Sequence, residues 1–141
     1  MECKVNWVPQ SGMAMLAESG SGHAVVMDVA PESGGRNLGV RPMEMLLMGT
    51  AGCTTVDVVH ILKKGRHDVR GCEVRIQGKR AQAEPKVFVT LNFHFVVTGK
   101  GLTREVVERA IHLSHEKYCS ASIMMAKTAQ ISTSFDVIEA A

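Results

Sequence analysis

The stretch PMEMLLMGTAGCTTVDVVHILKKG at residues 42–65 decides how the rest of the chain must be arranged. Pro42 suits the first turn of a helix, and Gly65 after two lysines suits a helix end. The pattern predicts one helix of about 20 residues that is apolar on almost every side. Such a helix belongs inside a protein core, because an exposed face would leave a large apolar surface in water.

The few polar side chains of this helix fall on one stripe, at about 100° per residue. Cys53, Asp57, His60 and Lys64 follow one another at spacings of four, three and four residues. In one interpretation Cys53 is a small buried hydrophobe and the other three mark where the helix surfaces. In the other, a reactive thiol begins a line of titratable groups.

Composition indicates a globular protein. The chain has 141 residues, 45% hydrophobic and 21% charged, which predicts a single domain over residues 1–141. Sixteen basic against fourteen acidic residues give a net charge of +2, so no nucleic-acid surface is indicated. The N-terminus contains no apolar run, and we therefore expect no signal peptide, no membrane span and a cytoplasmic location. In a reducing compartment the four cysteines should be free, catalytic or transiently bridged.

Alternating patterns separated by turn residues flank the helix. Three precede it and predict a three-stranded meander: Cys3–Pro9, Met13–Glu18 and Ala24–Val29. Two further strands and a final one are predicted after it: Asp68–Gln82, Lys86–Thr98 and Ile131–Ile138. The second of these should bury Val87, Val89, Leu91, Phe93, Phe95 and Val97. Thr103 is placed to cap one helix, and Tyr118–Ser122 opens another. The order β-β-β-α-β-β-α-α-β predicts an α+β fold.

The four cysteines differ in their surroundings. Cys3 lies at the start of a strand and Cys72 inside one, and we interpret both as structural or incidental. Cys119 is expected at the start of a short helix, where unpaired backbone N–H groups stabilise an anion. That position should lower the pKa of the Cys119 thiol and favour nucleophilic chemistry. An ordinary cysteine at a helix start is the alternative.

Two motifs carry a resemblance to a known family. PMEMLL followed by GTAGC, which ends at Cys53, and HEKYCS around Cys119 resemble the OsmC/Ohr family of thiol peroxidases. The nearest branch is the OsmC-like one with Pro-Met-Glu-Met and Glu-Lys-Tyr-Cys-Ser motifs, and the resemblance spans nearly the whole chain. It implies an OsmC-like fold, with antiparallel sheets wrapped around a central buried helix. It also implies an intertwined homodimer with two active sites at the interface.

The resemblance further implies a reaction. Cys53 would be the peroxidatic cysteine and Cys119 the resolving cysteine of a thiol-dependent peroxidase that reduces organic hydroperoxides in oxidative-stress defence. The partners would be a hydroperoxide and a dithiol reductant, lipoyl-type or small, with no metal or cofactor. Apolar walls would suit an organic hydroperoxide, although core packing is the alternative for most of the candidate residues. These residues are Met43, Met45, Leu46, Met48, Met124 and Met125.

One part of the family pattern is missing. In the hydroperoxide-reducing branch an arginine of the first hairpin contacts the thiolate, and a glutamate directly after the proline holds that arginine. Here the hairpin reads SGM at residues 11–13, and Glu44 lies one position beyond the residue that follows Pro42. Arg36 or Arg41 is the candidate for the missing cation, which would favour a thiolate at the reactive cysteine. A solvated loop position is the alternative for Arg36.

The sequence is compatible with other functions as well. The same fold could sense oxidants through a Cys53–Cys119 bridge, or bind a small apolar ligand, without turning over a peroxide. Metal binding by Cys53, Asp57 and His60, with His115 added, is a third possibility, although no ligand spacing matches a known site.

Overall fold

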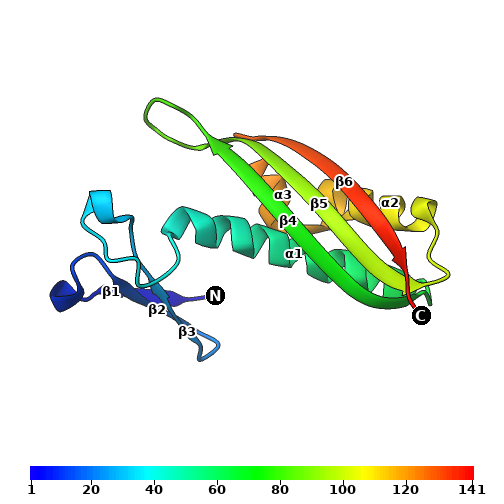
Figure 1. The fold of residues 1–141 in the computed structure, drawn as a ribbon, viewed down its shortest axis with the longest axis horizontal. Coiled ribbons are helices and arrows are strands. Elements are labelled where there is room, and N and C mark those ends of the chain that lie inside the picture. Colours follow the sequence, from blue (N-terminus) through cyan, green and yellow to red (C-terminus); the bar gives the residue numbers. More distant parts are fainter. The chain divides into compact units, whose positions relative to one another are not determined.

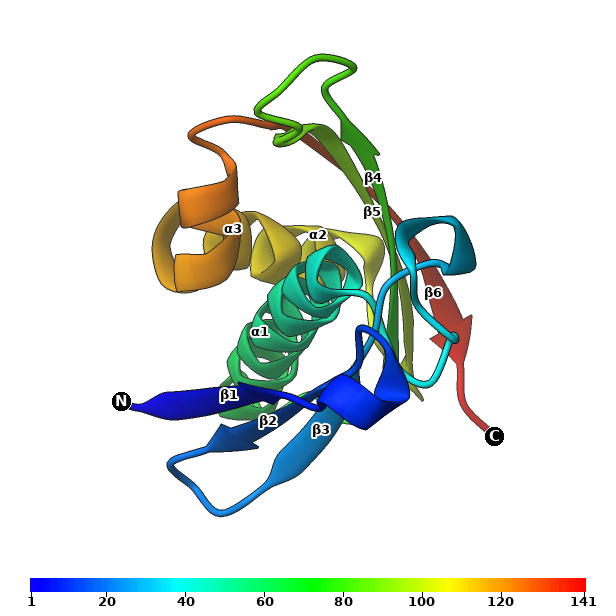
Figure 2. The same cartoon turned by 90° about the vertical axis from the view of Figure 1, so that its left-hand side faces the viewer.

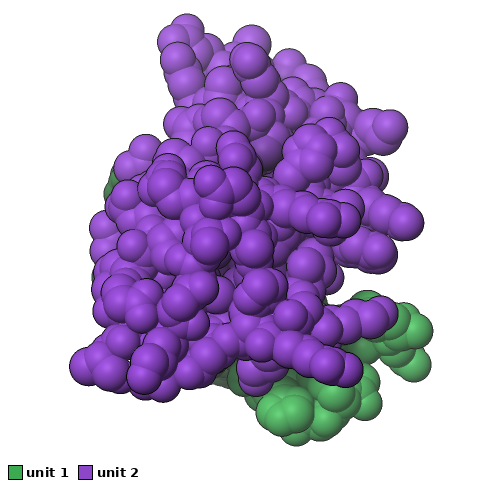
Figure 3. All heavy atoms as spheres, turned by 90° about the vertical axis from the view of Figure 1, so that its right-hand side faces the viewer, with its two compact units in different colours: residues 1–46 green, residues 47–141 purple.

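Six strands and three α-helices follow one another in the order that the sequence predicts. The computed structural model describes residues 1–141, which form two compact units, residues 1–46 and 47–141 (Figure 3). Two 3-10 turns and one π turn, which the sequence pattern did not indicate, complete the elements. The single domain expected from the chain length remains a prediction.

Residues 1–46 contain the predicted antiparallel meander. Its strands are β1 (Cys3–Trp7), β2 (Met15–Ser19) and β3 (Ala24–Met27), paired in the order β1-β2-β3 (Figure 1). The 3-10 turns Pro9–Ser11 and Pro31–Ser33 lie in the connections, each beginning with proline. Proline suits the first position of a helical turn because its missing N–H would have no partner there.

The loop after β3 is organised by the buried carboxylate of Asp28. Its Oδ1 accepts a hydrogen bond from the backbone N–H of Val29 at 2.8 Å. Its Oδ2 accepts from the N–H groups of Arg36 at 2.9 Å and Leu38 at 3.1 Å. These bonds, the one from Leu38 foremost, hold the pKa of Asp28 below its ordinary value. A single carboxylate thus fixes the loop that leads into the central helix.

The central helix α1 runs from Pro42 to Lys64, as predicted. Its buried residues are spaced four apart on one stripe: Thr50, Thr54, Val58 and Leu62. On other sides Met48 and Val56 are 46% and 54% exposed, so the expected burial all round is not reached within one chain. By length and composition α1 could cross a membrane, with a mean hydropathy of 1.5 over 18 residues. Core helices of soluble proteins pass the same test.

The second sheet consists of β4 (Asp68–Arg80), β5 (Phe88–Lys100) and β6 (Gln130–Glu139), in that order. β4 and β5 pair antiparallel, whereas β5 and β6 pair parallel, so this sheet is mixed where the sequence led us to expect antiparallel pairing. A parallel neighbour requires a long crossover. Helices α2 (Arg104–Leu113) and α3 (Ser120–Met125) supply it, on the same face of the sheet (Figures 1 and 2).

β5 provides much of the core. Four of the residues predicted on its inner face are at most 1% exposed: Leu91, Phe93, Phe95 and Val97. The prediction fails at the start of the strand, where Phe88 is buried and Val89 is only partly so. The pairing of β4 with β5 shifts register between Lys79 and Arg80. Such a bulge reverses the alternation of side chains, which a period of two cannot anticipate.

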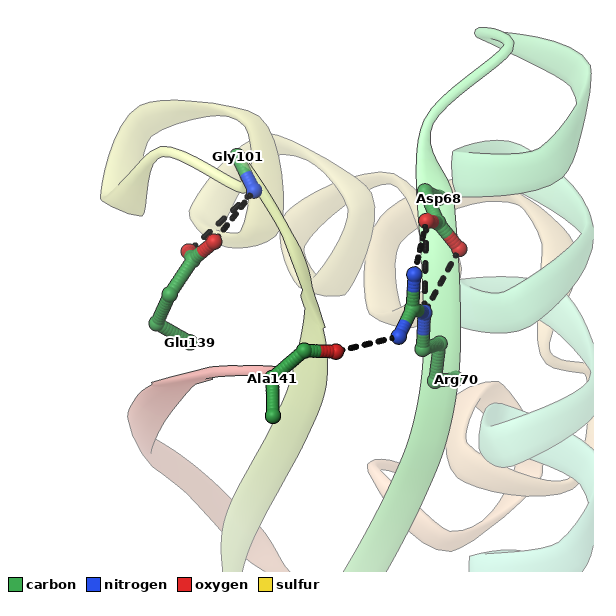
Figure 4. A network of polar contacts seen from close by, with 5 residues as sticks. All are labelled: Asp68, Arg70, Gly101, Glu139 and Ala141. Atoms are coloured by element: carbon green, nitrogen blue, oxygen red, sulfur yellow. Dashed lines mark hydrogen bonds and ion pairs between the residues drawn. The ribbon is translucent and has the colours of Figure 1, made fainter.

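Hydrogen bonds between distant residues join the ends of the second sheet (Figure 4). Arg70 on β4 pairs with Asp68 at 2.8 Å and donates to the carbonyl of Ala141 at 2.7 Å. Both carboxylate oxygens of Glu139 accept from the N–H of Gly101 at 3.1 Å. The end of β6 is therefore held against the turn after β5, and the chain beyond it against β4.

Candidate active site

The structure brings Cys53 and Cys119 together. Cys53 lies in the middle of α1 and is half-buried, whereas Cys119 directly precedes α3 and is fully buried. The two sulfur atoms and a carboxylate oxygen of Asp57 all lie within 4.8 Å of one another. Both thiols are free. A small movement of the side chains would bring the sulfurs to bonding distance.

A π turn, Ser114–Tyr118, sets the position of the second cysteine. The backbone N–H of Cys119 donates to the carbonyl of Ser114 at 2.7 Å, five residues back. The buried hydroxyl of Ser114 donates to Asp57 Oδ2 at 3.0 Å and lies 2.8 Å from Thr54 Oγ1. A serine hydroxyl has a single proton, so Thr54 must donate to Ser114. These bonds tie α1 to the turn that holds Cys119, and π turns are frequent at functional sites.

The thiol of Cys119 is less acidic than its helix-start position suggested. Its Sγ does accept a hydrogen bond from the Ser122 N–H at 3.4 Å, as expected of a residue that caps α3. Burial nevertheless raises the pKa of the Cys119 thiol, Ser122 opposes the rise, and nearby Cys53 adds to it. The predicted lowering of this pKa was wrong, because α3 has six residues and its dipole does not compensate for the loss of water.

The other two cysteines stand apart from this group. Cys3 is exposed on β1, and Cys72 is half-buried on β4. Burial raises the pKa of the Cys72 thiol, which disfavours a reactive thiolate. These positions agree with the structural or incidental role inferred from the sequence.

The polar stripe of α1 borders a pocket. Three of its members, Asp57, His60 and Lys64, line a pocket of about 750 Å³. The remaining lining residues are Ile61, Gly65, Leu113 and Tyr118. The stripe therefore marks a recess that includes Asp57, rather than only the surface of the helix.

The methionine wall expected around the site is not part of this pocket. Met48 and Met124 are 46% and 67% exposed, so neither packs in the core of the single chain. The apolar lining of the pocket comes instead from Ile61, Leu113 and Tyr118. Exposed methionines on and near α1 are apolar surface that a partner could cover.

The metal hypothesis expected Cys53 and Asp57 to converge with His60 and His115. The group that the structure gathers contains Cys119 in place of both histidines. The ring of His115 packs edge-on against Phe93, at 4.7 Å between centroids, and neither ring nitrogen has a hydrogen-bond partner. Burial lowers the pKa of His115, and the charge of Asp57 opposes this effect. Three donors fall short of the four that closed zinc sites use.

Three further candidates lie in the N-terminal unit, and each has a local partner. Arg36 Nη1 lies 3.5 Å from the carbonyl of Gln10, and Arg41 Nη1 donates to Asn37 Oδ1. Glu44 Oε2 accepts a hydrogen bond from the backbone N–H of Arg41 at 2.9 Å. That bond is the reach-back contact of a capping box at the start of α1. A chemical role for any of the three remains a prediction.

Known proteins resemble the chain over nearly its whole length. Residues 34–134 match a family model described as OsmC-like protein. The chain belongs to the OsmC-like family. It is 44% identical to Protein YhfA of Escherichia coli strain K12 over 140 residues, which is 99% of this chain and 100% of that protein. The family predicted from the two motifs is thus confirmed.

Solved structures share the fold of this chain. A hypothetical protein from Aquifex aeolicus VF5 is 28% identical, with a TM-score of 0.84 over 99% of this chain and 97% of that one. The organic hydroperoxide resistance protein OhrB of Bacillus subtilis is 19% identical, with a TM-score of 0.65 over 96% and 98%. At that identity the likeness to OhrB shows a shared fold.

The sequence motifs indicated both cysteines but not two residues that lie between them in the chain. Ser114 continues the buried stripe of α2 that contains Val107, Ala110 and Ile111. A serine at a core position needs a hydrogen-bond partner, and that signal could have indicated a buried contact. Asp57 was already on the stripe with the first cysteine, and its closeness to the second depends on the π turn.

Proposed function

We propose that this OsmC-like protein is a thiol-dependent peroxidase that reduces organic hydroperoxides in oxidative-stress defence. The observation that carries the proposal is the approach of the Cys53 and Cys119 sulfurs to within 4.8 Å. The thiolate of Cys53 attacks one peroxide oxygen, the O–O bond breaks, an alcohol leaves and a sulfenic acid remains. Cys119 then displaces the hydroxyl of that sulfenic acid as water and forms a disulfide. A dithiol restores both thiols by exchange.

Burial supports the order in which the two cysteines act. Cys53 is half-buried and can be reached from outside, whereas Cys119 is fully enclosed. A hydroperoxide would therefore meet Cys53 first. The enclosed partner is suited to intercept the sulfenic acid before a second peroxide oxidises it further.

A cation beside Cys53 would favour its thiolate, and we propose Arg36 or Arg41 for this role with Glu44 as the supporting acid. Each guanidinium has five N–H donors, so one hydrogen bond to Gln10 or Asn37 leaves donors for a thiolate. R36M and R41M decide between the two arginines. Replacement of the arginine that contacts Cys53 should slow oxidation of Cys53. Replacement of the other arginine should leave the wild-type rate.

We further propose a cytoplasmic homodimer paired through α1. The apolar side chains that α1 leaves exposed support this pairing, with Met48 at 46% and Val56 at 54%. Four free cysteines suit a reducing compartment. Light scattering should give twice the mass of the chain for the wild-type protein and a monomer for V56E. A monomeric wild-type protein would count against the pairing.

The peroxidase proposal is tested with purified protein, cumene hydroperoxide and a dithiol such as dihydrolipoamide. Wild-type protein should consume the peroxide, and C53S should not. C119S should retain a sulfenic acid at Cys53 that dimedone traps. C72S, which removes the half-buried thiol of β4, is the matched control and should behave as wild type. Absence of turnover with every dithiol would contradict the proposal, and a bridge formed without turnover would favour oxidant sensing.

A further inference from the structure

We propose that Asp57 is the base that accepts the proton of Cys119 when the Cys53–Cys119 disulfide forms. This inference rests on the proposed function and names a proton acceptor within the same site. Three observations support it: the burial of the Cys119 thiol, the position of the Asp57 carboxylate near both sulfurs, and the hydrogen bonds that hold this carboxylate.

The resolving step needs a base because Cys119 is a protonated thiol. Thiols attack sulfur as thiolates, and the neutral form is a poor nucleophile. Burial raises the pKa of the Cys119 thiol above its ordinary value, so few molecules carry the thiolate near neutral pH. Because Cys119 is fully buried, bulk water is poorly placed to take the proton.

The Asp57 carboxylate is placed to take that proton. One of its oxygens lies within 4.8 Å of both sulfur atoms. Its Oδ2 accepts a hydrogen bond from Ser114, and Oδ1 accepts none from the protein. Asp57 also lines the 750 Å³ pocket, through which a proton or a water molecule can leave. The carboxylate therefore lies near the reacting atoms and borders an outlet.

Two hydroxyl groups hold the carboxylate in this position. Thr54 donates to Ser114, and Ser114 donates to Asp57, so both hydrogen bonds point toward the charge. Thr54 and Ser114 are buried. A buried, directed pair of hydrogen bonds fixes the orientation of an anion more firmly than water does.

Other titratable groups surround the site, from α1 and from the π turn. On α1 they are Cys53, His60 and Lys64. On the π turn they are His115 and Tyr118, together with the exposed Glu116 and Lys117. His60, Lys64 and Tyr118 line the pocket with Asp57 but are not in the group within 4.8 Å of both sulfurs. Both ring nitrogens of His115 are buried without a partner. Asp57 is thus the acceptor that the geometry favours.

The step balances in atoms and electrons. Cys119 loses its proton to Asp57 and attacks the sulfur of the Cys53 sulfenic acid. The S–S bond forms, the S–O bond breaks, and the departing hydroxide takes the proton from Asp57 and leaves as water. The sulfur of Cys119 is oxidised and that of Cys53 is reduced, so no further oxidant or reductant is needed.

The test measures the two oxidation steps separately. Protein is mixed with one equivalent of cumene hydroperoxide and quenched at intervals, and mass spectrometry follows sulfenic acid and disulfide. D57N should slow disulfide formation by about 100-fold, the scale of a positioned base, and should leave formation of the sulfenic acid nearly unchanged. The amide introduced can still accept the hydrogen bond from Ser114, so the fold is preserved.

The pH profile separates proton transfer from a structural effect. Between pH 6 and 8 the D57N rate of disulfide formation should rise about tenfold per pH unit, as the Cys119 thiolate fraction does below its raised pKa. The wild-type rate should vary much less. D57E should recover most of the rate, and H23N, which alters an exposed histidine outside the pocket, should match wild type.

The outcomes distinguish the two proposals. A D57N rate and pH profile equal to those of the wild-type protein would overturn the role of Asp57 and leave the peroxidase intact. A D57E protein as slow as D57N would also contradict a role for the carboxylate. Wild-type protein that forms no sulfenic acid at Cys53 would overturn the proposed function itself.

Discussion

Asp28 and Asp57 show how one residue type serves two purposes in this OsmC-like protein. In residues 1–46, Asp28 accepts three backbone hydrogen bonds and fixes a loop. In residues 47–141, apolar packing supplies the order, and the Asp57 carboxylate lies near two sulfurs and accepts a single protein hydrogen bond, from Ser114. A saturated carboxylate holds structure, whereas a partly satisfied one in a pocket is available for chemistry.

The largest effect expected is loss of apolar packing in residues 47–141. Phe93 is 1% exposed and packs against Phe95 and His115. F93A should lower the free energy of unfolding by about 3–5 kcal/mol in urea denaturation. K79A, an exposed change on β4, should stay within about 0.5 kcal/mol of wild type. A loss of stability below about 1 kcal/mol for F93A would show that residues 47–141 do not depend on apolar packing, and the contrast with residues 1–46 would then fail.

The next effect concerns the loop around Asp28. D28A leaves the N–H groups of Val29, Arg36 and Leu38 without their acceptor. Hydrogen exchange at the Arg36 and Leu38 amides should accelerate by at least about tenfold, as expected when bonds to a charged acceptor are lost. D68A removes an exposed carboxylate paired with Arg70 and should leave these amides unchanged. Unaltered protection in D28A would show that the loop is held by other contacts.

A smaller effect should appear on acidification. Burial lowers the pKa of His115 in the folded protein, so the unfolded chain takes up a proton first as the pH falls. The contribution of neutral His115 to the free energy of unfolding is therefore present above about pH 6.5. It is lost as the pH falls toward the pKa of His115 in the folded protein. The urea midpoint should decrease more from pH 7.5 to 5.5 in wild type than in H115F. H112Q alters an exposed histidine paired with Glu116 and should retain the wild-type decrease.

The smallest effect expected is at the start of α1. E44A removes the hydrogen bond to the backbone N–H of Arg41 and should cost about 1 kcal/mol or less. E44Q can keep an acceptor there and should cost less still. If Glu44 also supports an arginine near Cys53, peroxide consumption by E44Q will fall although its stability does not. Equal stability and activity in E44Q and wild type would limit Glu44 to capping.

Much of the fold could be predicted because the relevant signals are local. Pro42 and Gly65 delimit α1, Thr103 caps α2, and turn residues separate the strands. The parallel pairing of β6 and the burial of Phe88 could not be predicted, because they depend on the crossover and on a bulge. Local patterns do not encode which strands become neighbours.

The site was predictable in part for the same reason. The motifs at Cys53 and Cys119 pointed to both sulfurs, and the α1 stripe contained Asp57. The position of Cys119 at a helix start predicted a lowered pKa for its thiol. That direction was wrong, because the loss of water on burial raises the pKa more than the dipole of a six-residue helix lowers it. The π turn that joins Ser114 to Asp57 leaves no local pattern of its own.

The most direct test of the account is peptide mapping of wild-type protein after one equivalent of organic hydroperoxide. We expect loss of two hydrogen atoms per chain and a single cross-linked peptide pair containing Cys53 and Cys119, with Cys3 and Cys72 still free. Cross-links shared among all four cysteines, or oxidation of Cys53 with no bridge to Cys119, would contradict it.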